Sequence, residues 1–138
     1  MPNVEEAIAR LFDAQNLSFI GTVDPDGYPA IRAMLRPRHF DGIRTIYFST
    51  NAPTNKVRDI AGNPKACVYV CDPARFEGAC LKGTMELLTD AHHKALLWRD
   101  GDTLYYPGGV TDPGYVALRF TAISARRYGD FASTEITL

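Results

Sequence analysis

Two hydrophobic periodicities divide the chain into predicted helices and strands. Near the N-terminus, apolar residues recur with the spacing of one face of an α-helix. They are Val4, Ala7, Ile8, Leu11 and Phe12. Asn3 precedes this segment and Glu6 follows three residues later, which is the arrangement of a capping box. The pattern therefore predicts a peripheral helix over residues 4–15.

Period-two or continuous apolar segments predict six strands in the rest of the chain. These strands are residues 17–23, 30–36, 43–49, 65–72, 77–89 and 116–128. Turns rich in Pro, Asp and Gly separate them, as at residues 24–29. Gly83 interrupts the fifth strand, which predicts a bulge or a close backbone approach there. Residues 129–138 are expected to add an edge strand.

Two further helices are predicted between strands. Residues 54–61 have one apolar face and end at Gly62, and residues 90–101 begin at Asp90, a capping residue. Short turns between strands indicate an antiparallel sheet, and a small antiparallel sheet avoids exposed edges by closing. We therefore expect a mainly β fold, a β-barrel with peripheral helices, as a single domain over residues 1–138.

Polar residues gather where the third strand gives way to the following helix, in "YFSTNAPTNKVRDI" (residues 47–60). The group consists of Ser49, Thr50, Thr54, Asn55 and Lys56. One interpretation is a helix cap. The other is an anion site, because a helix start has unpaired N–H groups and the positive end of the helix dipole.

The second strand adds two more cations. Arg32 and Arg36 share one face with Met34, about 13 Å apart at the usual strand rise, while Ile31, Ala33 and Leu35 line the other. One interpretation is a polar outer face of the sheet. An anion site is the alternative that accounts for cations on both the strand and the helix start.

Composition narrows the classes of function. With 138 residues and a net charge of −1, the chain has no overall field for nucleic acid or an acidic membrane. It has no apolar run of membrane-spanning length and no signal-peptide pattern, so we expect a cytoplasmic protein. Cys67, Cys71 and Cys80 form no CxxC pair and are expected to be buried free thiols. His92 and His93 are adjacent on a predicted helix and point apart, so no metal site is expected.

The segments "GYPAIRAML", "YFSTNAPTNKVRDIAGNPKACVYV" and "LKGTMELLTD" resemble the flavin-binding split-barrel family related to pyridoxamine 5′-phosphate oxidase. The resemblance is closer to its short branch of general stress proteins. It covers nearly the whole chain and extends to the late "LWRDG…YYPGG…DPGYVALRF…ARRYGDF". It implies an antiparallel FMN-binding split barrel that forms a homodimer with FMN at the subunit interface.

The same resemblance implies a set of FMN-binding residues. Arg32, Ala33, Met34 and Leu35 would run along the cofactor, and Phe48, Ser49 and Thr50 would flank the ring and ribityl chain. Thr54, Asn55 and Lys56 would bind the phosphate. Trp98, Tyr106 and Pro107 would come from the partner subunit.

The resulting hypothesis is a flavin-dependent oxidoreductase acting on a small molecule, with no catalytic residue assigned. The alternatives are a non-catalytic module for flavin storage or stress sensing, and a split barrel that binds heme or a deazaflavin. A nucleic-acid platform on the Arg32 and Arg36 face is disfavoured by the neutral charge. The resembled oxidases carry a C-terminal arginine–histidine pair for the substrate phosphate. Since residues 129–138 contain no such pair, we expect poor oxidation of pyridoxamine 5′-phosphate.

Overall fold

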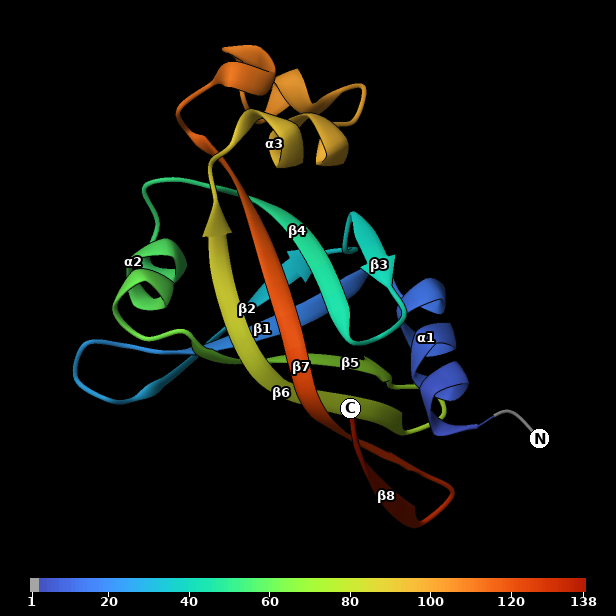
Figure 1. The fold of residues 1–138 in the computed structure, drawn as a ribbon. Coiled ribbons are helices and arrows are strands. Elements are labelled where there is room, and N and C mark those ends of the chain that lie inside the picture. Colours follow the sequence, from blue (N-terminus) through green and yellow to red (C-terminus); the bar gives the residue numbers. More distant parts are fainter. Residues whose placement is uncertain (1–2) are drawn as a thin grey trace.

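An eight-stranded antiparallel sheet organises the protein (Figure 1), whose computed structural model describes residues 3–138. The strands follow the order β2-β1-β5-β6-β7-β4-β3, and β8 pairs with the far end of β7. Their bounds are β1 Leu17–Val23, β2 Pro29–Leu35, β3 His39–Asp41, β4 Thr45–Asn51, β5 Lys65–Asp72, β6 Glu77–Leu88, β7 Tyr115–Gly129 and β8 Ala132–Thr137. The sheet curls on itself, which confirms the predicted mainly antiparallel β fold with peripheral helices.

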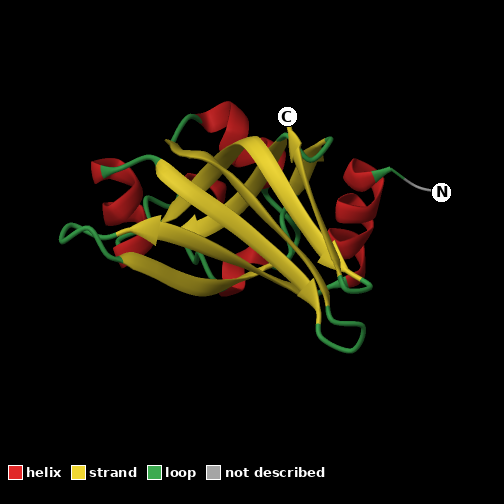
Figure 2. Cartoon of the chain, turned by 90° about the horizontal axis from the view of Figure 1, so that it is seen from below, coloured by secondary structure: helices red, strands yellow, loops and turns green. Residues whose placement is uncertain are grey.

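Three α-helices lie around the outside of the curled sheet (Figure 2). They are α1 Val4–Ala14, α2 Asn55–Gly62 and α3 Ala91–Leu97, and short 3₁₀ turns follow at Asp102–Leu104 and Gly109–Thr111. The Asn3 side chain accepts a hydrogen bond from the Glu6 N–H at 2.8 Å, so the predicted cap of the first helix is confirmed.

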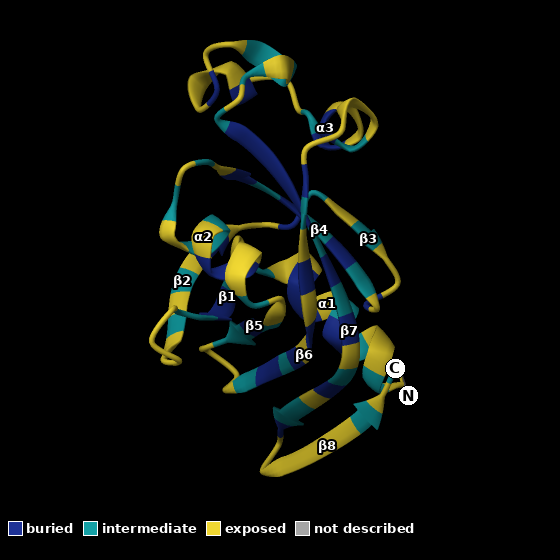
Figure 3. Cartoon of the chain, turned by 60° about the vertical axis from the view of Figure 1, so that its left-hand side comes forward, coloured by how far each residue is buried: buried dark blue, intermediate teal, exposed yellow. Residues whose placement is uncertain are grey.

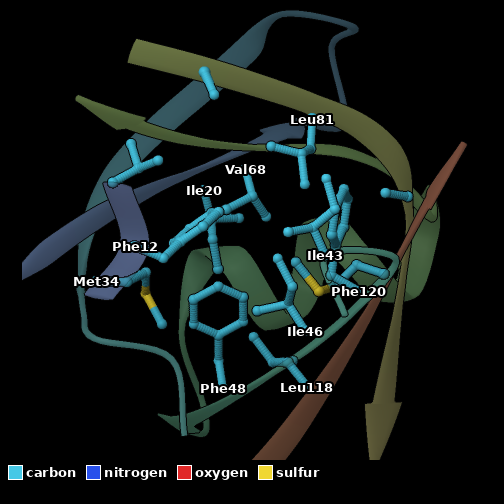
Figure 4. Close-up of a cluster of buried hydrophobic side chains, with 14 of the residues drawn as sticks. Phe12, Ile20, Met34, Ile43, Ile46, Phe48, Val68, Leu81, Leu118 and Phe120 are labelled. Atoms are coloured by element: carbon cyan, nitrogen blue, oxygen red, sulfur yellow. The ribbon is translucent and has the colours of Figure 1, made fainter. Parts of the chain in front are cut away.

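The core lies inside the curl, where α1 and six strands contribute side chains (Figure 4). Phe12 of α1 is 1% exposed and packs among residues of the sheet. The other labelled members are Ile20, Met34, Ile43, Ile46, Phe48, Val68, Leu81, Leu118 and Phe120. Burying one such side chain contributes about 1.5–3 kcal/mol, so the apolar stripe predicted for the first helix holds α1 against the barrel.

A bulge in β6 allows the two longest strands to bend around the core. The pairing of β6 with β7 shifts register between Lys82 and Gly83. A Cβ atom at Gly83 would lie 1.9 Å from the Thr121 carbonyl oxygen, so no larger residue fits there without a backbone shift. The prediction of a bulge and a close backbone approach at Gly83 is confirmed.

Two predicted elements differ from the observed ones. The third predicted strand is shifted to Thr45–Asn51 and pairs with the additional short strand β3. The helix predicted over residues 90–101 is α3, and it ends at Leu97, well before Gly101. The chain turns there because the Asp102 carboxylate accepts hydrogen bonds from the Arg99 N–H and from the Arg38 guanidinium. The bond from Arg38 comes from a distant part of the sequence, so the hydrophobic pattern of residues 90–101 could not predict it.

In β2, apolar side chains point outward and Arg32 points inward. Met34 is buried and Arg32 is partly buried on the inner face, whereas Ile31 is 73% exposed and Leu35 59% exposed. The interpretation of a polar outer face is therefore wrong for Arg32, whereas Arg36, just beyond the end of the strand, is exposed. Exposed and less exposed positions alternate along β2 (Figure 3).

The three cysteines are free, as expected, but the prediction that they are buried is wrong. Cys67, Cys71 and Cys80 are all partly exposed. Alternation explains the difference. In β5 the side chains of Val68 and Val70 point into the core, so Cys67 and Cys71 point outward, as Cys80 does between the buried Ala79 and Leu81 of β6.

Candidate functional site

A cavity lies at the seam where the barrel does not close. Strand β2 is at one end of the strand order and β4 is next to the strand at the other end, and the two do not pair with each other. Between them is a cavity of about 220 Å³, bordered also by the segment after the first 3₁₀ turn. Its lining residues are Ala33, Met34, Leu35, Arg36, Arg38, Phe48, Ser49, Thr50, Asn51, Tyr105 and Tyr106.

Seven of the residues predicted to bind a cofactor meet at this seam cavity. They are Ala33, Met34, Leu35, Phe48, Ser49, Thr50 and Tyr106. Tyr106 lines the cavity of its own chain. Sequence reasoning missed Arg36, Arg38, Asn51 and Tyr105, although each lies within two residues of a predicted one or, for Arg38, in the cationic "RPRHF" segment.

The walls of the seam cavity are mainly apolar, with one unsatisfied polar atom. Phe48 is 1% and Met34 8% exposed, and Leu35 and Tyr105 stand at the mouth. The Ser49 hydroxyl oxygen is buried and has no hydrogen-bond partner within residues 3–138.

An ion pair fixes the aromatic wall of the cavity. The Arg38 guanidinium donates to both carboxylate oxygens of Asp102, at 2.7 and 2.9 Å, and to the Leu97 carbonyl at 3.2 Å. Burial alone would raise the pKa of Asp102, but the bonds from Arg38 and from the Arg99 N–H lower it below its ordinary value. The Asp102 carbonyl accepts from the N–H groups of Tyr105 and Tyr106, so the pair positions both rings.

Trp98 and Pro107 lie outside the cavity. The Trp98 ring packs at 6.1 Å from the Tyr106 ring and at 5.3 Å from that of Tyr115, behind the cavity wall. Pro107 is exposed and does not line the cavity.

Burial raises the pKa of Tyr106 to about 12, so its hydroxyl stays protonated at neutral pH.

A second group of predicted residues lies at the start of α2. Thr54 caps this helix, with its hydroxyl accepting from the Val57 N–H at 3.4 Å. The helix begins at Asn55, which is exposed, and its first N–H groups have no partner within the helix. The cap interpretation is confirmed, and the cap occupies the Val57 N–H, so only the N–H groups of Asn55 and Lys56 at this helix start have no partner within residues 3–138.

Arg32 reaches this helix start from β2. Its guanidinium donates to the Thr22 hydroxyl at 2.7 Å and lies 3.6 Å from the buried carboxylate of Asp59 in α2. That carboxylate also accepts from Arg58 at 3.0 Å and from Thr22 at 3.1 Å. Asp59 is therefore shared among several donors. The Nη1 group of Arg32 also donates to the carbonyl oxygens of Ile20 at 3.4 Å and Ala30 at 3.3 Å, whereas its Nη2 group has only the 3.6 Å approach to Asp59.

Lys56 completes the cation cluster, which we define as Arg32, Lys56 and Arg58. Lys56 has no ion-pair partner in the described part of the chain. Burial and the nearby positive charge of Arg32 lower its pKa below the usual value. Because two cations approach each other here, an anion between them would relieve their repulsion.

Other kinds of site find less support within residues 3–138. No group of three or more His, Cys, Asp or Glu side chains is placed to hold a metal ion. No helix there is long and apolar enough to cross a membrane.

Comparison with known proteins agrees with this arrangement. A family model described as pyridoxamine 5′-phosphate oxidase matches residues 4–128. A pyridoxine/pyridoxamine 5′-phosphate oxidase of Bradyrhizobium diazoefficiens is 32% identical over 92 residues, which are 67% of this chain. That match spans only 42% of the length of the curated relative.

Solved structures share the fold over almost the full chain. A Clostridium acetobutylicum protein related to general stress protein 26 is 35% identical, with a TM-score of 0.89 over 97% of this chain and 94% of its own. General stress protein 26 of Bacillus anthracis is 19% identical with a TM-score of 0.79, over 98% of each chain. A heme binding protein from Mycobacterium smegmatis is 16% identical, with a TM-score of 0.80 over 99% of this chain and 59% of its own. The last two similarities show the fold alone.

Proposed function

The chain belongs to the pyridoxamine 5′-phosphate oxidase family, and on that premise we propose that it binds FMN at the seam and acts as a flavin-dependent oxidoreductase on a small molecule. The observation that carries the proposal is the pairing of two features along β2. The positive charge of Arg32 lies near enough to Lys56 to lower its pKa, and the next three residues of the same strand line a mainly apolar cavity. A ligand with a flat apolar ring and an anionic end suits both.

The residues present fit the parts of FMN. Met34, Phe48 and Tyr106 supply apolar and aromatic surface for the ring. The Ser49 hydroxyl and the Asn51 amide can hydrogen-bond to polar atoms of the ring or ribityl chain. Arg32, Lys56, the Thr54 cap and the exposed Asn55 form a site for the phosphate, since charge-assisted hydrogen bonds are the strongest available here.

When bound, the flavin would supply the electron-transfer chemistry itself. The residues of the chain would bind, orient and shield it. Arg32 and Lys56 would fix the phosphate end, and Tyr105 and Tyr106, held by the Arg38–Asp102 pair, would cover one side of the ring site. Arg36 lies exposed at the cavity lining, where it would be open to a negatively charged group of a substrate.

Two observations support the proposal of a homodimer with the cofactor at the subunit interface. The seam cavity holds about 220 Å³, below the roughly 300–1,000 Å³ typical of small-molecule pockets, so one chain provides only part of a flavin site. Beside it, the outer face of β1 and β2 exposes Leu17 by 47%, Ile31 by 73% and Leu35 by 59%. Exposed apolar side chains that adjoin an incomplete site favour a second subunit there.

Flavin is favoured over heme by the ligands at the cavity. Histidine is a frequent axial ligand of heme iron, but none of His39, His92 and His93 lines the cavity. Met34, Tyr105 and Tyr106 are the lining side chains that could ligate an iron. The cation cluster at one end also suits a single phosphate.

The test is the visible absorption spectrum of the purified protein, followed by titration with FMN and sedimentation at low micromolar concentration. We expect a flavin spectrum, or tight FMN binding by flavin-free protein, in particles of two chains. A heme or deazaflavin spectrum would overturn the FMN assignment, and a monomer that binds FMN tightly would overturn the interface. A bound flavin that neither accepts electrons from reduced nicotinamides nor passes them to small acceptors would favour a storage or sensing module.

A further inference from the structure

A second cavity lies between two hairpin turns of the sheet. One turn joins β5 to β6 and the other joins β7 to β8, at the opposite end of the molecule from α3 (Figure 1). This hairpin cavity has a volume of about 410 Å³, which is within the range of small-molecule sites. Its lining side chains include Arg75, Phe76, Tyr128, Asp130 and Phe131.

Three residues of the hairpin cavity have an unfavourable backbone conformation. Phe76, Asp130 and Phe131 have φ angles of 50°, 54° and 61°, and within residues 3–138 no other non-glycine residue has a positive φ. Asp130 and Phe131 are the central residues of a two-residue turn, a position that favours Asn and Gly. The turn explains the positive φ angles, but not the presence of phenylalanine, because a bulky residue is strained there.

The two phenylalanine side chains are also exposed to solvent. Phe76 is 79% exposed and Phe131 is fully exposed, more than any other Phe, Tyr or Trp within residues 3–138. Backbone strain and apolar exposure both reduce stability, and packing within the chain does not offset them. Since both phenylalanines line the same cavity, a ligand that packs against their rings would offset the exposure.

The floor of the hairpin cavity is a tyrosine ring that is held in place. The hydroxyl groups of Tyr128 and Tyr69 share a hydrogen bond. Gly78 lies directly opposite Tyr128, and a Cβ atom at Gly78 would come within 2.6 Å of the Tyr128 hydroxyl oxygen, so the ring lies across the glycine. The Phe76 ring is 5.8 Å from the Tyr128 ring and tilted by 54°. These rings form a fixed aromatic surface on which a flat apolar group can pack.

Two opposite charges lie at the same cavity without pairing. Arg75 and Asp130 are exposed, and neither side chain has an ion pair or hydrogen bond in the described part of the chain. They therefore remain available to a ligand that carries both an anionic and a cationic group.

We propose that the hairpin cavity binds a free aromatic amino acid. The ring of the ligand packs against Phe76 and Phe131, over Tyr128. Its carboxylate binds the Arg75 guanidinium, and its ammonium group binds the Asp130 carboxylate. None of these residues lines the seam cavity, so the proposal is independent of the flavin.

The experiment titrates the purified protein, at its native oligomeric state, with L-tryptophan and follows binding by calorimetry and by amide NMR shifts. We expect a dissociation constant on the order of 0.5 mM or lower, as for a ligand of this size, with shifts at Phe76 and Phe131. Tryptamine lacks the carboxylate and indole-3-propionate lacks the ammonium group. Each should bind about two- to fivefold more weakly, because exposed charge pairs contribute modestly.

Phe131→Gly separates binding from stability. It should weaken tryptophan binding roughly tenfold, because it removes an aromatic wall, while the melting temperature should not fall, because glycine suits this backbone. Tyr28→Ala is the matched control, since it removes an exposed aromatic side chain near another turn, outside the hairpin cavity, and it should leave binding unchanged. Arg75→Gln should weaken the binding of tryptophan but not that of tryptamine.

Four results would overturn the proposal. They are no tryptophan binding up to about 10 mM, shifts confined to other parts of the chain, equal affinity for tryptophan, tryptamine and indole-3-propionate, and undiminished binding by Phe131→Gly. Dissociation of the native oligomer in Phe131→Gly would also overturn it, because the cavity would then be a contact between subunits.

Discussion

Two arginine–aspartate pairs border the candidate site, and they differ in how fully each carboxylate is used. Arg38 donates to both oxygens of Asp102 at 2.7 and 2.9 Å, so that each charge has one principal partner. Arg32 approaches Asp59 only to 3.6 Å, because Arg58 and Thr22 already bind that carboxylate. In the first pair, which we call saturated, both carboxylate oxygens bind the arginine. In the second, unsaturated pair, the arginine has no hydrogen bond to the carboxylate.

The difference in saturation separates a structural role from a binding role. Arg32 and Arg58 both approach Asp59, and Lys56 lies near enough to Arg32 for that positive charge to lower its pKa. The cation cluster therefore carries three positive charges against this one carboxylate, an excess of two. A phosphate group carries about −1.5 to −2 charges at neutral pH and would balance that excess. The Arg38–Asp102 pair is neutral as it stands, so it holds the aromatic wall and attracts no anion.

Removing the saturated pair should have the largest effect. Asp102→Ala leaves Arg38, whose side chain is only 16% exposed, without its partner. Breaking a buried pair in this way costs about 3–5 kcal/mol, so we expect the free energy of unfolding, measured by urea denaturation, to fall by that amount. FMN affinity should fall as well, because Tyr105 and Tyr106 lose their support.

Glu135→Ala is the matched control for this loss. It removes the partner of Arg126 from an exposed ion pair at 3.1 Å. The free energy of unfolding should then fall by about 1 kcal/mol or less. If Asp102→Ala destabilises the protein no more than Glu135→Ala does, the Arg38–Asp102 pair does not hold the wall.

Removing a cation from the unsaturated group should affect binding more than folding. Lys56→Ala should weaken FMN binding by about 1.5–3 kcal/mol, or roughly 10- to 150-fold, since it removes a charged hydrogen-bond donor to the phosphate. The free energy of unfolding should change little, because Lys56 has no ion-pair partner within residues 3–138. Calorimetric titration with FMN measures the first quantity and urea denaturation the second.

Riboflavin, which lacks the phosphate, provides the internal control for Lys56. It should bind to wild type and Lys56→Ala with nearly equal affinity, and Lys65→Ala, an exposed lysine at the start of β5, should leave FMN binding unchanged. If Lys56→Ala weakens the binding of riboflavin as much as the binding of FMN, Lys56 does not bind the phosphate.

The smallest predicted effect is the dependence of FMN affinity on alkaline pH. Burial and Arg32 lower the pKa of Lys56 in the free protein, and a bound phosphate would raise it again. The contribution of Lys56 to FMN affinity should therefore be fully present below the pKa that Lys56 has in the free protein. It should be lost as the pH rises through the higher pKa that Lys56 has in the complex. Titrations across alkaline pH should show this decline in wild type, and a profile in Lys56→Ala that declines as steeply would contradict it.

Much of the fold was predictable because its signals are local. Asn3 with Glu6, the apolar stripe of α1, the alternation of the strands and the bulge at Gly83 each depend on a few neighbouring residues. The residues of the candidate site were also largely predictable, through the resemblance of the β2 and β4 segments to a known family. Arg38 was missed because its partner Asp102 is 64 residues away in the chain.

By itself, the sequence determined most of the secondary structure, since periodicity, capping and turn composition act over short distances. Tertiary structure alone decided which way each face points. Alternation in β2 and β5 is the same whichever face meets the core, and only closure of the sheet placed Arg32 inward, Ile31 outward and Val68 in the core. It also decided which charges remain unpaired, because the sharing of Asp59 among Arg58, Thr22 and Arg32 depends on three elements meeting in space.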